Sequence, residues 1–267
     1  MPETVFDVQE VVYRYQRVTA LDGLSVRVAR GQRIALMGAN GSGKSTLLRM
    51  LAALIFPDNG SVTFCGEKLT EQRFEATNFS RQFRRRVGLV FQNPDVQLFS
   101  PTVFDEVAFA PLQLAWPREK IRSEVDRMLE MLKISHLKDR PPHHLSTGEK
   151  KRVALASVMI LDPEVLLLDE PTAGLDPSSA SQMIDSLIGL RGGRKTVVAT
   201  THDLDIVEDI ADYCFVLQAG RVVAAGVPSE ILANRTLLED SRLLHAHRHI
   251  HPSGEVHSHP HLHSHKH

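Results

Sequence analysis

The sequence lacks the features that mark secreted and membrane-spanning proteins. Its 267 residues include only two cysteines, Cys65 and Cys214, which are too few for a disulfide framework and are expected to be buried thiols in a reducing compartment. No apolar run approaches the roughly 18–20 residues needed to span a bilayer. The first residues have neither the basic start nor the apolar centre of a signal peptide. These absences predict a cytosolic chain.

Net charge is also nearly absent. The formal charge is −1, so we expect no electrostatic capture of nucleic acid by the chain as a whole. The local basic run at 84–86 is of a kind that usually forms a solvated face. The hydrophobic and charged fractions, 42% and 24%, are typical of a globular chain that buries one large core or two modest ones.

The pattern of apolar residues predicts an α/β fold. Short apolar or alternating runs predict strands, and apolar residues at i, i+3 and i+4 predict helices. Buried strands alternating with helices indicate a parallel sheet covered on both faces, and the first two strands have an antiparallel character. Strands are expected over 5–15, 20–29, 33–37, 61–66, 86–91, 165–168, 195–200 and 213–218, and helices over 44–54, 102–114, 118–134, 150–161, 178–190, 204–211 and 228–234.

These elements predict three parts. Residues 1–92 and 163–235 form an α/β core, and residues 93–162 form a helical subdomain inserted into it. Residues 236–267 hold a short helix and a flexible tail in which histidine is the commonest residue.

A glycine-rich stretch from Gly38 to Ser45, between a predicted strand and a predicted helix, fits the phosphate-binding pattern G-x-x-x-x-G-K-[ST]. Glycines let successive backbone N–H groups converge on phosphate oxygens at the positive end of the following helix. Lys44 adds a positive charge, and the Ser45 hydroxyl can ligate Mg²⁺. The residues expected to bind a nucleotide are Gly38, Asn40, Gly41, Ser42, Gly43, Lys44, Ser45 and Thr46.

Two acidic residues follow the strand expected over 165–168. Asp169 is expected to hold Mg²⁺ through water, and Glu170 to orient and deprotonate an attacking water. A positioned base of this kind contributes roughly 10²–10⁴ in rate. Acids at a strand end are weak evidence alone, but with the phosphate loop they predict nucleotide hydrolysis.

The stretch 144–152, HLSTGEKKR, looks like the signature motif L-S-G-G-Q of ABC transporter ATPases, and the chain resembles that family over about residues 5–235. The resemblance implies a P-loop ABC ATPase fold with an antiparallel β subdomain and a helical insert, and ATP and Mg²⁺ as cofactors. It gives roles to four further sites: Tyr15 stacks on adenine, Gln92 contacts the γ-phosphate and Mg²⁺, residues 174–176 form the D-loop, and His202 contacts the γ-phosphate and holds Glu170 and the water in place.

Two residues of the signature differ from the usual motif: Thr147 stands in place of glycine and Glu149 in place of glutamine. Ser146 and Gly148 remain, and with Glu149 they are expected to contact the γ-phosphate, since a hydroxyl and an N–H lie there at a helix N-terminus. Thr147 adds bulk at the dimer seam. We expect it to be tolerated, and a lower ATPase rate is the alternative.

The resemblance also implies a dimer. In this family each ATP lies between the phosphate loop of one subunit and the signature helix of its partner, so Lys44 and Ser146 serve different nucleotides. This chain has one phosphate loop, and a head-to-tail homodimer is the simplest expectation; a heterodimer with a second ATPase is the alternative.

Longer stretches, over 91–114, 141–177 and 201–226, resemble energy-coupling-factor ATPases, most of all those of cobalt and nickel import. This implies a transmembrane coupling protein, which docks on the segment holding Asp95 and Gln97, a membrane-embedded substrate-binding component, and a place at the cytoplasmic face of the membrane. Cobalt is the expected substrate, with nickel or a vitamin as alternatives. Two other classes stay open: an ABC ATPase of DNA repair or translation, and a metal sensor or store with a nucleotide switch.

The tail, residues 245–267, interleaves histidine with other residues, unlike a purification tag. Neutral imidazoles bind Co²⁺, Ni²⁺, Cu²⁺ and Zn²⁺. We expect the tail to bind divalent metal weakly and at several sites, and a solvated end without function is the alternative.

Overall fold

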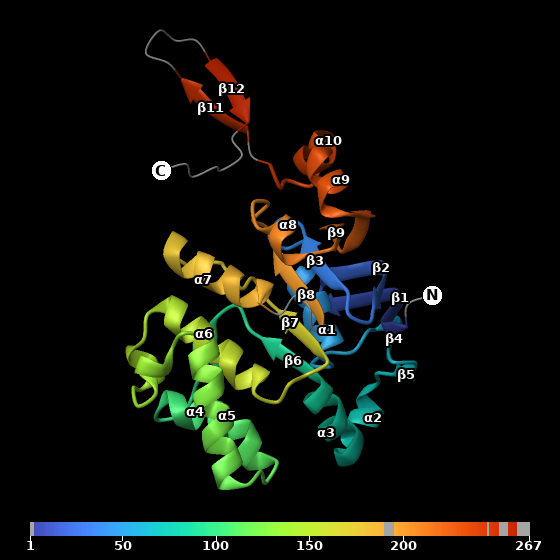
Figure 1. Cartoon of the computed structure of the whole chain (residues 1–267). Coiled ribbons are helices and arrows are strands. Elements are labelled where there is room, and N and C mark those ends of the chain that lie inside the picture. The colour runs from blue at the N-terminus through green and yellow to red at the C-terminus, as the bar shows by residue number, and fades with distance from the viewer. Residues whose placement is uncertain (1–2, 190–194, 245, 251–255, 261–267) are drawn as a thin grey trace.

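The computed structural model describes residues 3–189 and 195–244, together with the backbone of 246–250 and 256–260. Within these residues the chain forms a six-stranded central sheet, a four-stranded sheet beside it, a helical insert and a C-terminal strand pair (Figure 1). No helix of the described residues is long and apolar enough to cross a membrane.

The central sheet has the strand order β10-β9-β3-β8-β7-β6. The five strands from β9 to β6 run parallel to their neighbours, and β10 is antiparallel to β9. The parallel sheet predicted from the sequence is therefore confirmed. Its strands are β3 (Arg33–Met37), β6 (Val87–Val90), β7 (Val165–Leu168), β8 (Thr196–Thr201), β9 (Tyr213–Gln218) and β10 (Arg221–Gly226).

The strands β3, β7 and β8 at the centre of this sheet are buried along their whole length, which explains why they are mostly apolar and do not alternate with exposed polar residues. Successive side chains of a strand point to opposite faces. On β3, Ile34 and Leu36 belong to one hydrophobic cluster, which includes the apolar residues of helix α1 (Lys44–Leu51). Ala35 and Met37 belong to the other cluster, which includes residues of α6 (Thr147–Met159), α7 (Pro177–Ile188) and α8 (Val207–Ile210).

The second sheet is antiparallel and has the order β2-β1-β4-β5. Two helices follow it that the sequence did not predict, because their stretch is strongly charged and its few apolar residues are phenylalanines. Phe74 packs edge-on against Phe79 and Phe83, and Phe83 packs edge-on against Phe64. The elements are β1 (Thr4–Tyr15), β2 (Val18–Ala29), β4 (Asn59–Phe64), β5 (Glu67–Lys68), α2 (Glu71–Glu75) and α3 (Thr77–Arg86).

The helical insert leaves the core after β6 and returns to it before β7. Its central contact joins α4 (Val103–Gln113) and α6, and α5 (Arg118–Met131) packs on both. Thr102 caps α4, with its hydroxyl accepting a hydrogen bond from the Asp105 N–H at 3.1 Å. Three single turns connect these helices: η1 (Pro94–Val96), η2 (Ser135–Leu137) and η3 (Pro142–His144).

After β10 the chain forms α9 (Pro228–Ala233) and α10 (Arg235–Asp240), followed by β11 (Ala246–Ile250) and β12 (Val256–Pro260). The last two pair as an antiparallel ladder, drawn in red in Figure 1, where the sequence predicted a flexible tail. The alternation of histidine with other residues has the period of a strand. The remaining tail residues, 245, 251–255 and 261–267, lie outside the described residues.

Both cysteines are free. Cys214 is buried in β9, and burial raises the pKa of its thiol to about 12. Cys65 is only half-buried, so the prediction of a buried thiol is wrong there. It lies in the turn between β4 and β5 with a left-handed backbone, at the edge of the core, where it packs against the hydrophobic cluster but stays partly exposed.

Candidate nucleotide-hydrolysis site

Three neighbouring strands of the central sheet end at the same edge, and each is followed by residues that the sequence singled out. The phosphate loop follows β3, Asp169 and Glu170 follow β7, and His202 follows β8. These strands are parallel, with Met37 opposite Thr201 and Leu168 opposite Ala199. The topology therefore brings together side chains that are more than a hundred residues apart in the sequence.

The phosphate loop fits so closely against the core that two of its glycines are required. At Gly38, with φ of +147°, a β-carbon would lie 2.3 Å from the Leu217 carbonyl oxygen and 2.5 Å from Ser42 Oγ. At Gly43, with φ of +108°, it would lie 2.8 Å from the Ala20 carbonyl oxygen. The buried Ser42 hydroxyl has no hydrogen-bond partner among the described residues. A ligand with acceptor oxygens would satisfy it.

Lys44 begins helix α1 and turns its ammonium group into the loop. Its Nζ donates hydrogen bonds to the carbonyl oxygens of Gly38, at 2.7 Å, and Ala39, at 3.2 Å, and lies 3.6 Å from Glu170 Oε1. Burial lowers the pKa of Lys44, and the nearby carboxylates of Glu170 and Asp169 oppose that shift. A desolvated ammonium in this position favours an anionic ligand such as a phosphate.

A hydroxyl–carboxylate cluster lies beside Lys44. Ser45 Oγ and Thr200 Oγ1 each donate to Asp169 Oδ1 at 2.8 Å, and Thr200 Oγ1 also accepts from the Glu170 N–H at 2.8 Å. Hydroxyl and carboxylate oxygens are the ligands that Mg²⁺ prefers, so the residues fit the predicted metal. The sequence did not identify Thr200. Its only signal is a hydroxyl at the end of an apolar strand, two residues before His202.

Glu170 is held in an unusual backbone conformation, with φ of +47°. Its carboxylate is buried, and Oε2 lies 2.9 Å from Nδ1 of His202, whose side chain is about half exposed. A buried carboxylate in contact with a solvent-accessible ring can accept a proton from a bound water. The predicted contact between His202 and Glu170 is therefore present.

Lys44, Ser45 and Glu170 line a pocket of about 290 Å³, and Asp169 and His202 lie behind its lining, in contact with Ser45 and Glu170. The Tyr15 ring lies at its rim, 40% exposed, and packs edge-on against Tyr13. The sequence did not identify Val18, which is 67% exposed beside it. The only signal in the sequence was an apolar residue three positions after the aromatic Tyr15. The lining is Tyr15, Val18, Thr19, Ala20, Asn40, Gly41, Gly43, Lys44, Ser45, Thr46, Gln92 and Glu170.

The signature residues do not line this pocket. Ser146 caps α6, accepting from the Glu149 N–H, while its own N–H and hydroxyl donate to Glu149 Oε2 at 2.8 Å each. The Ser146 N–H lowers the pKa of Glu149. Glu149 thus completes a reciprocal cap. Thr147 is exposed, and Gly148 lies so close to Ser179 that a β-carbon would approach its Oγ to 2.6 Å.

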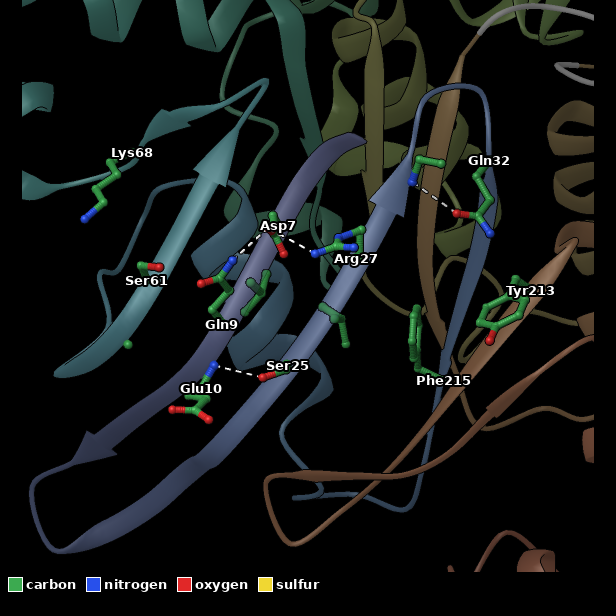
Figure 2. A pocket seen from close by; sticks show the side chains of 14 residues that line it. Asp7, Gln9, Glu10, Ser25, Arg27, Gln32, Ser61, Lys68, Tyr213 and Phe215 are labelled. Atoms are coloured by element: carbon green, nitrogen blue, oxygen red, sulfur yellow. Dashed lines mark hydrogen bonds and ion pairs between the residues drawn. The ribbon is translucent and has the colours of Figure 1, made fainter. Parts of the chain in front are cut away.

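A second hollow lies away from this pocket, lined by residues of β1, β2 and β4 of the antiparallel sheet and by Tyr213 and Phe215 of β9 (Figure 2). Figure 2 shows Asp7 between two polar neighbours: Asp7 accepts from Gln9 Nε2 at 2.9 Å and from Arg27 Nη2 at 3.5 Å. The hollow is about 970 Å³ but open and solvated. Its size alone indicates no ligand.

The fold and the pocket define a nucleotide-binding protein, and comparisons with known proteins agree. A family model described as ABC transporter matches residues 21–173. The nickel import ATP-binding protein NikO of Rhodobacter capsulatus is 54% identical over 242 residues, 90% of this chain and 95% of that protein. The energy-coupling factor transporter ATP-binding protein EcfA of Methanothermobacter thermautotrophicus is 41% identical over 240 residues, 90% of this chain and 76% of that protein.

Among solved structures, cbiO1 from Clostridium perfringens, part of the ABC transporter complex cbiONQ, matches with a TM-score of 0.77 and 37% identity, over 90% of this chain and 95% of that one. The chain belongs to the ABC transporter family of ATP-binding proteins. Within it, the chain is an ATPase of the energy-coupling-factor type, coupled to transport, so the resemblance seen in the sequence is confirmed.

Proposed function

We propose that this chain is the ATP-hydrolysing subunit of an importer for a divalent transition metal, with nickel ahead of cobalt. The observation that carries the ATPase role is that Glu170, in the pocket that the phosphate loop lines, contacts both Lys44 and His202. Nickel is favoured because a nickel import protein is 54% identical over 90% of the chain. The sequence prediction of cobalt becomes the second candidate.

The residues of the pocket account for hydrolysis. The phosphate loop and Lys44 hold the β- and γ-phosphates. His202 contacts both Glu170 and the γ-phosphate and so fixes their relative positions. Glu170 accepts a proton from a water molecule while the oxygen of that water bonds to the γ-phosphorus. The bond between that phosphorus and the β,γ-bridging oxygen breaks, which yields ADP and phosphate.

Ser45, Asp169 and Gln92 are the residues proposed to hold Mg²⁺. The ion would neutralise charge on the phosphate oxygens. Ser45 Oγ and Asp169 Oδ1 already lie 2.8 Å apart. Gln92 lines the pocket just after β6, where the helical insert begins. A contact between Gln92 and a nucleotide would therefore affect the position of the insert.

The position of the signature supports a head-to-tail dimer with a second copy of the chain. Ser146 and Gly148 are absent from the pocket that holds Lys44, so in one chain the nucleotide meets the phosphate loop alone. A partner's signature helix would supply the missing contacts. ATP then closes the dimer, and its hydrolysis releases it.

An apolar patch on the helical insert is proposed to dock the coupling protein in the membrane. Phe99 and Phe109 pack edge-on with ring centroids 4.9 Å apart, although both are exposed. Leu112, three residues after Phe109 on α4, is 52% exposed, and Val96, three residues before Phe99, is 69% exposed. Clusters of exposed aromatic and aliphatic side chains mark binding sites. The energy-coupling-factor resemblance makes a cytoplasmic helix of the coupling protein the occupant, which would place the chain at the membrane face.

The docking prediction for Asp95 and Gln97 is refined by their contacts. Gln97 accepts from the Phe91 N–H at 3.2 Å and donates to the Ala154 carbonyl at 3.0 Å. Asp95 pairs with Lys150 of α6 at 2.8 Å. Both side chains therefore hold the docking segment on α6, and the exposed apolar side chains are left to meet the partner.

The uptake experiment tests the assignment. Vesicles holding the whole complex should take up labelled Ni²⁺ when ATP is supplied to the face that binds this chain, and excess unlabelled Co²⁺ should compete less well than unlabelled Ni²⁺. Lys44→Ala should reduce uptake to background, because charge-assisted hydrogen bonds to phosphate are lost. Absence of ATP-dependent uptake of either metal would refute the metal substrate, and preference for Co²⁺ would restore the sequence prediction.

The histidine-rich tail is proposed to hold Ni²⁺ near the importer. In the ladder, His247 is opposite His259 and His249 is opposite His257. Residues in direct register, and residues two apart on one strand, share a face of a sheet. The backbone register therefore places these four positions on the same face of the ladder.

Removal of residues 245–267 should lower the number of Ni²⁺ ions bound in equilibrium dialysis while ATP hydrolysis stays within about twofold, because every residue of the pocket lies before them. Binding should also fall below about pH 6, where imidazoles protonate. A chain with His247, His249, His257 and His259 changed to Asn tests the shared face. If both variants bind as much Ni²⁺ as the wild type, the tail is a solvated end.

A further inference from the structure

Lys151 is a buried lysine that the hydrolysis mechanism does not use. It lies on α6, five residues after the signature serine, and only 3% of it is exposed. Its Nζ donates to two main-chain carbonyl oxygens, those of Glu170 and Ala173, at 2.8 Å each. Both acceptors belong to the segment that joins β7 to the D-loop.

This segment is a tight turn that sets the position of the catalytic carboxylate. The Ala173 N–H donates to the Glu170 carbonyl at 3.2 Å and closes the turn. Glu170 has φ of +47°, a conformation that is uncommon for a residue with a side chain. From the other side, the Glu170 N–H donates to Thr200 Oγ1 at 2.8 Å. The Lys151 ammonium thus holds both carbonyl ends of the turn that carries Glu170.

Burial is costly for an ammonium group, and it lowers the pKa of Lys151 to about 8. A lysine is kept in such a place when its donors have fixed partners. Its neighbour Lys150 provides the contrast, because Lys150 pairs with the side chain of Asp95, which is 64% exposed. Lys151 therefore joins the signature helix to the turn that carries Glu170.

We propose that Lys151 is a positioning residue: it holds the main chain of Glu170 and the start of the D-loop, and so couples the signature helix to the carboxylate that activates water in the same chain. The proposal rests on the proposed role of Glu170. Further contacts fix α6 to the segment after the turn, since Arg152 pairs with Gln182 of α7 and Gly148 packs against Ser179. A shift of α6 toward a partner's nucleotide would move the Glu170 turn with it.

Lys151→Met tests the proposal in the full chain, because methionine fills a similar volume without a donor. We expect the kcat for ATP hydrolysis to fall about 10–100-fold, the loss that follows a displacement of about 1 Å in a catalytic group. The KM for ATP should stay within about threefold, because Lys151 does not line the nucleotide pocket. Lys151→Arg, which can still donate to two carbonyls, should recover part of kcat. Lys120→Met, which changes an exposed lysine of α5 in the same helical insert, is the control and should retain wild-type kcat.

A double-mutant comparison separates positioning from a general loss of structure. In a Glu170→Gln background, Lys151→Met should add little to the loss of kcat, because the carboxylate that Lys151 positions is already absent. The same fold loss in both backgrounds, or an unchanged kcat in Lys151→Met, would overturn the proposal. If Glu170→Gln alone hydrolyses ATP at the wild-type rate, the proposed function fails instead.

Discussion

Glu170→Gln is expected to reduce ATP hydrolysis by about 10²–10⁴-fold while ATP binding is retained. The substitution keeps the size of the side chain but removes the group that accepts a proton from water. It also removes the negative charge that lies 3.6 Å from Lys44 Nζ. The ammonium is then free to act on phosphate, so the ATP-bound state should be at least as stable as in the wild type.

The measurement combines steady-state phosphate release with gel filtration in ATP. The variant should elute as a dimer with ATP and as a monomer without it. Glu164→Gln is a matched control, because Glu164 precedes the same strand at its other end and pairs with Arg86 at 2.7 Å, outside the pocket. A Glu170→Gln protein that hydrolyses ATP at the wild-type rate would disprove the assignment of the base.

Phe99→Asp is expected to abolish metal uptake by the complex, with a loss of at least about tenfold. Phe99 is 67% exposed and packs on Phe109, so it can anchor a partner helix. Burying a carboxylate against that helix would be strongly unfavourable. ATP affinity should remain near that of the wild type, because Phe99 is outside the nucleotide pocket.

Co-purification with the membrane components gives the direct readout, alongside uptake in vesicles. Met131→Asp is the matched control: it places the same charge on an exposed apolar residue of the same helical insert, at the end of α5. If Phe99→Asp supports normal uptake, or if Met131→Asp is equally inactive, the coupling protein does not dock on the patch around Phe99.

The central sheet and the phosphate loop could be predicted because their signals are local. A strand, a glycine-rich turn and a helix follow one another over 33–51, and each element has its own pattern. Helices α2 and α3 could not be predicted in this way. Phe79 and Phe83 do have helical spacing, but in a stretch this short and charged that one pair does not indicate a helix. The helices are held by Phe74 packing on Phe79 and Phe83 and by Phe83 packing on Phe64, and the sequence does not show which rings meet.

The same distinction applies to the site. Asp169, Glu170 and His202 have recognisable neighbours in the sequence, whereas Thr200 and Lys151 do not. Thr200 acts through a hydroxyl directed at Asp169 and the Glu170 N–H, and Lys151 through two carbonyl oxygens about twenty residues away. Every residue type has the same main-chain N–H and carbonyl groups, apart from proline. A hydrogen bond to the main chain therefore does not depend on which residue is bound, and the sequence alone cannot reveal it.

The hydrogen bonds of Gln97 and Glu106 have a consequence for how this protein can evolve. Gln97 ties the segment before Phe99 to α6, and the buried Glu106 carboxylate accepts from the N–H groups of Phe99 and Ser100 at 2.9 Å and 2.8 Å. The backbone that presents the apolar patch is thus fixed by groups beneath it. The exposed side chains could then be exchanged, and in the proposed complex a different membrane partner would be recruited, without disturbing the residues of the nucleotide pocket.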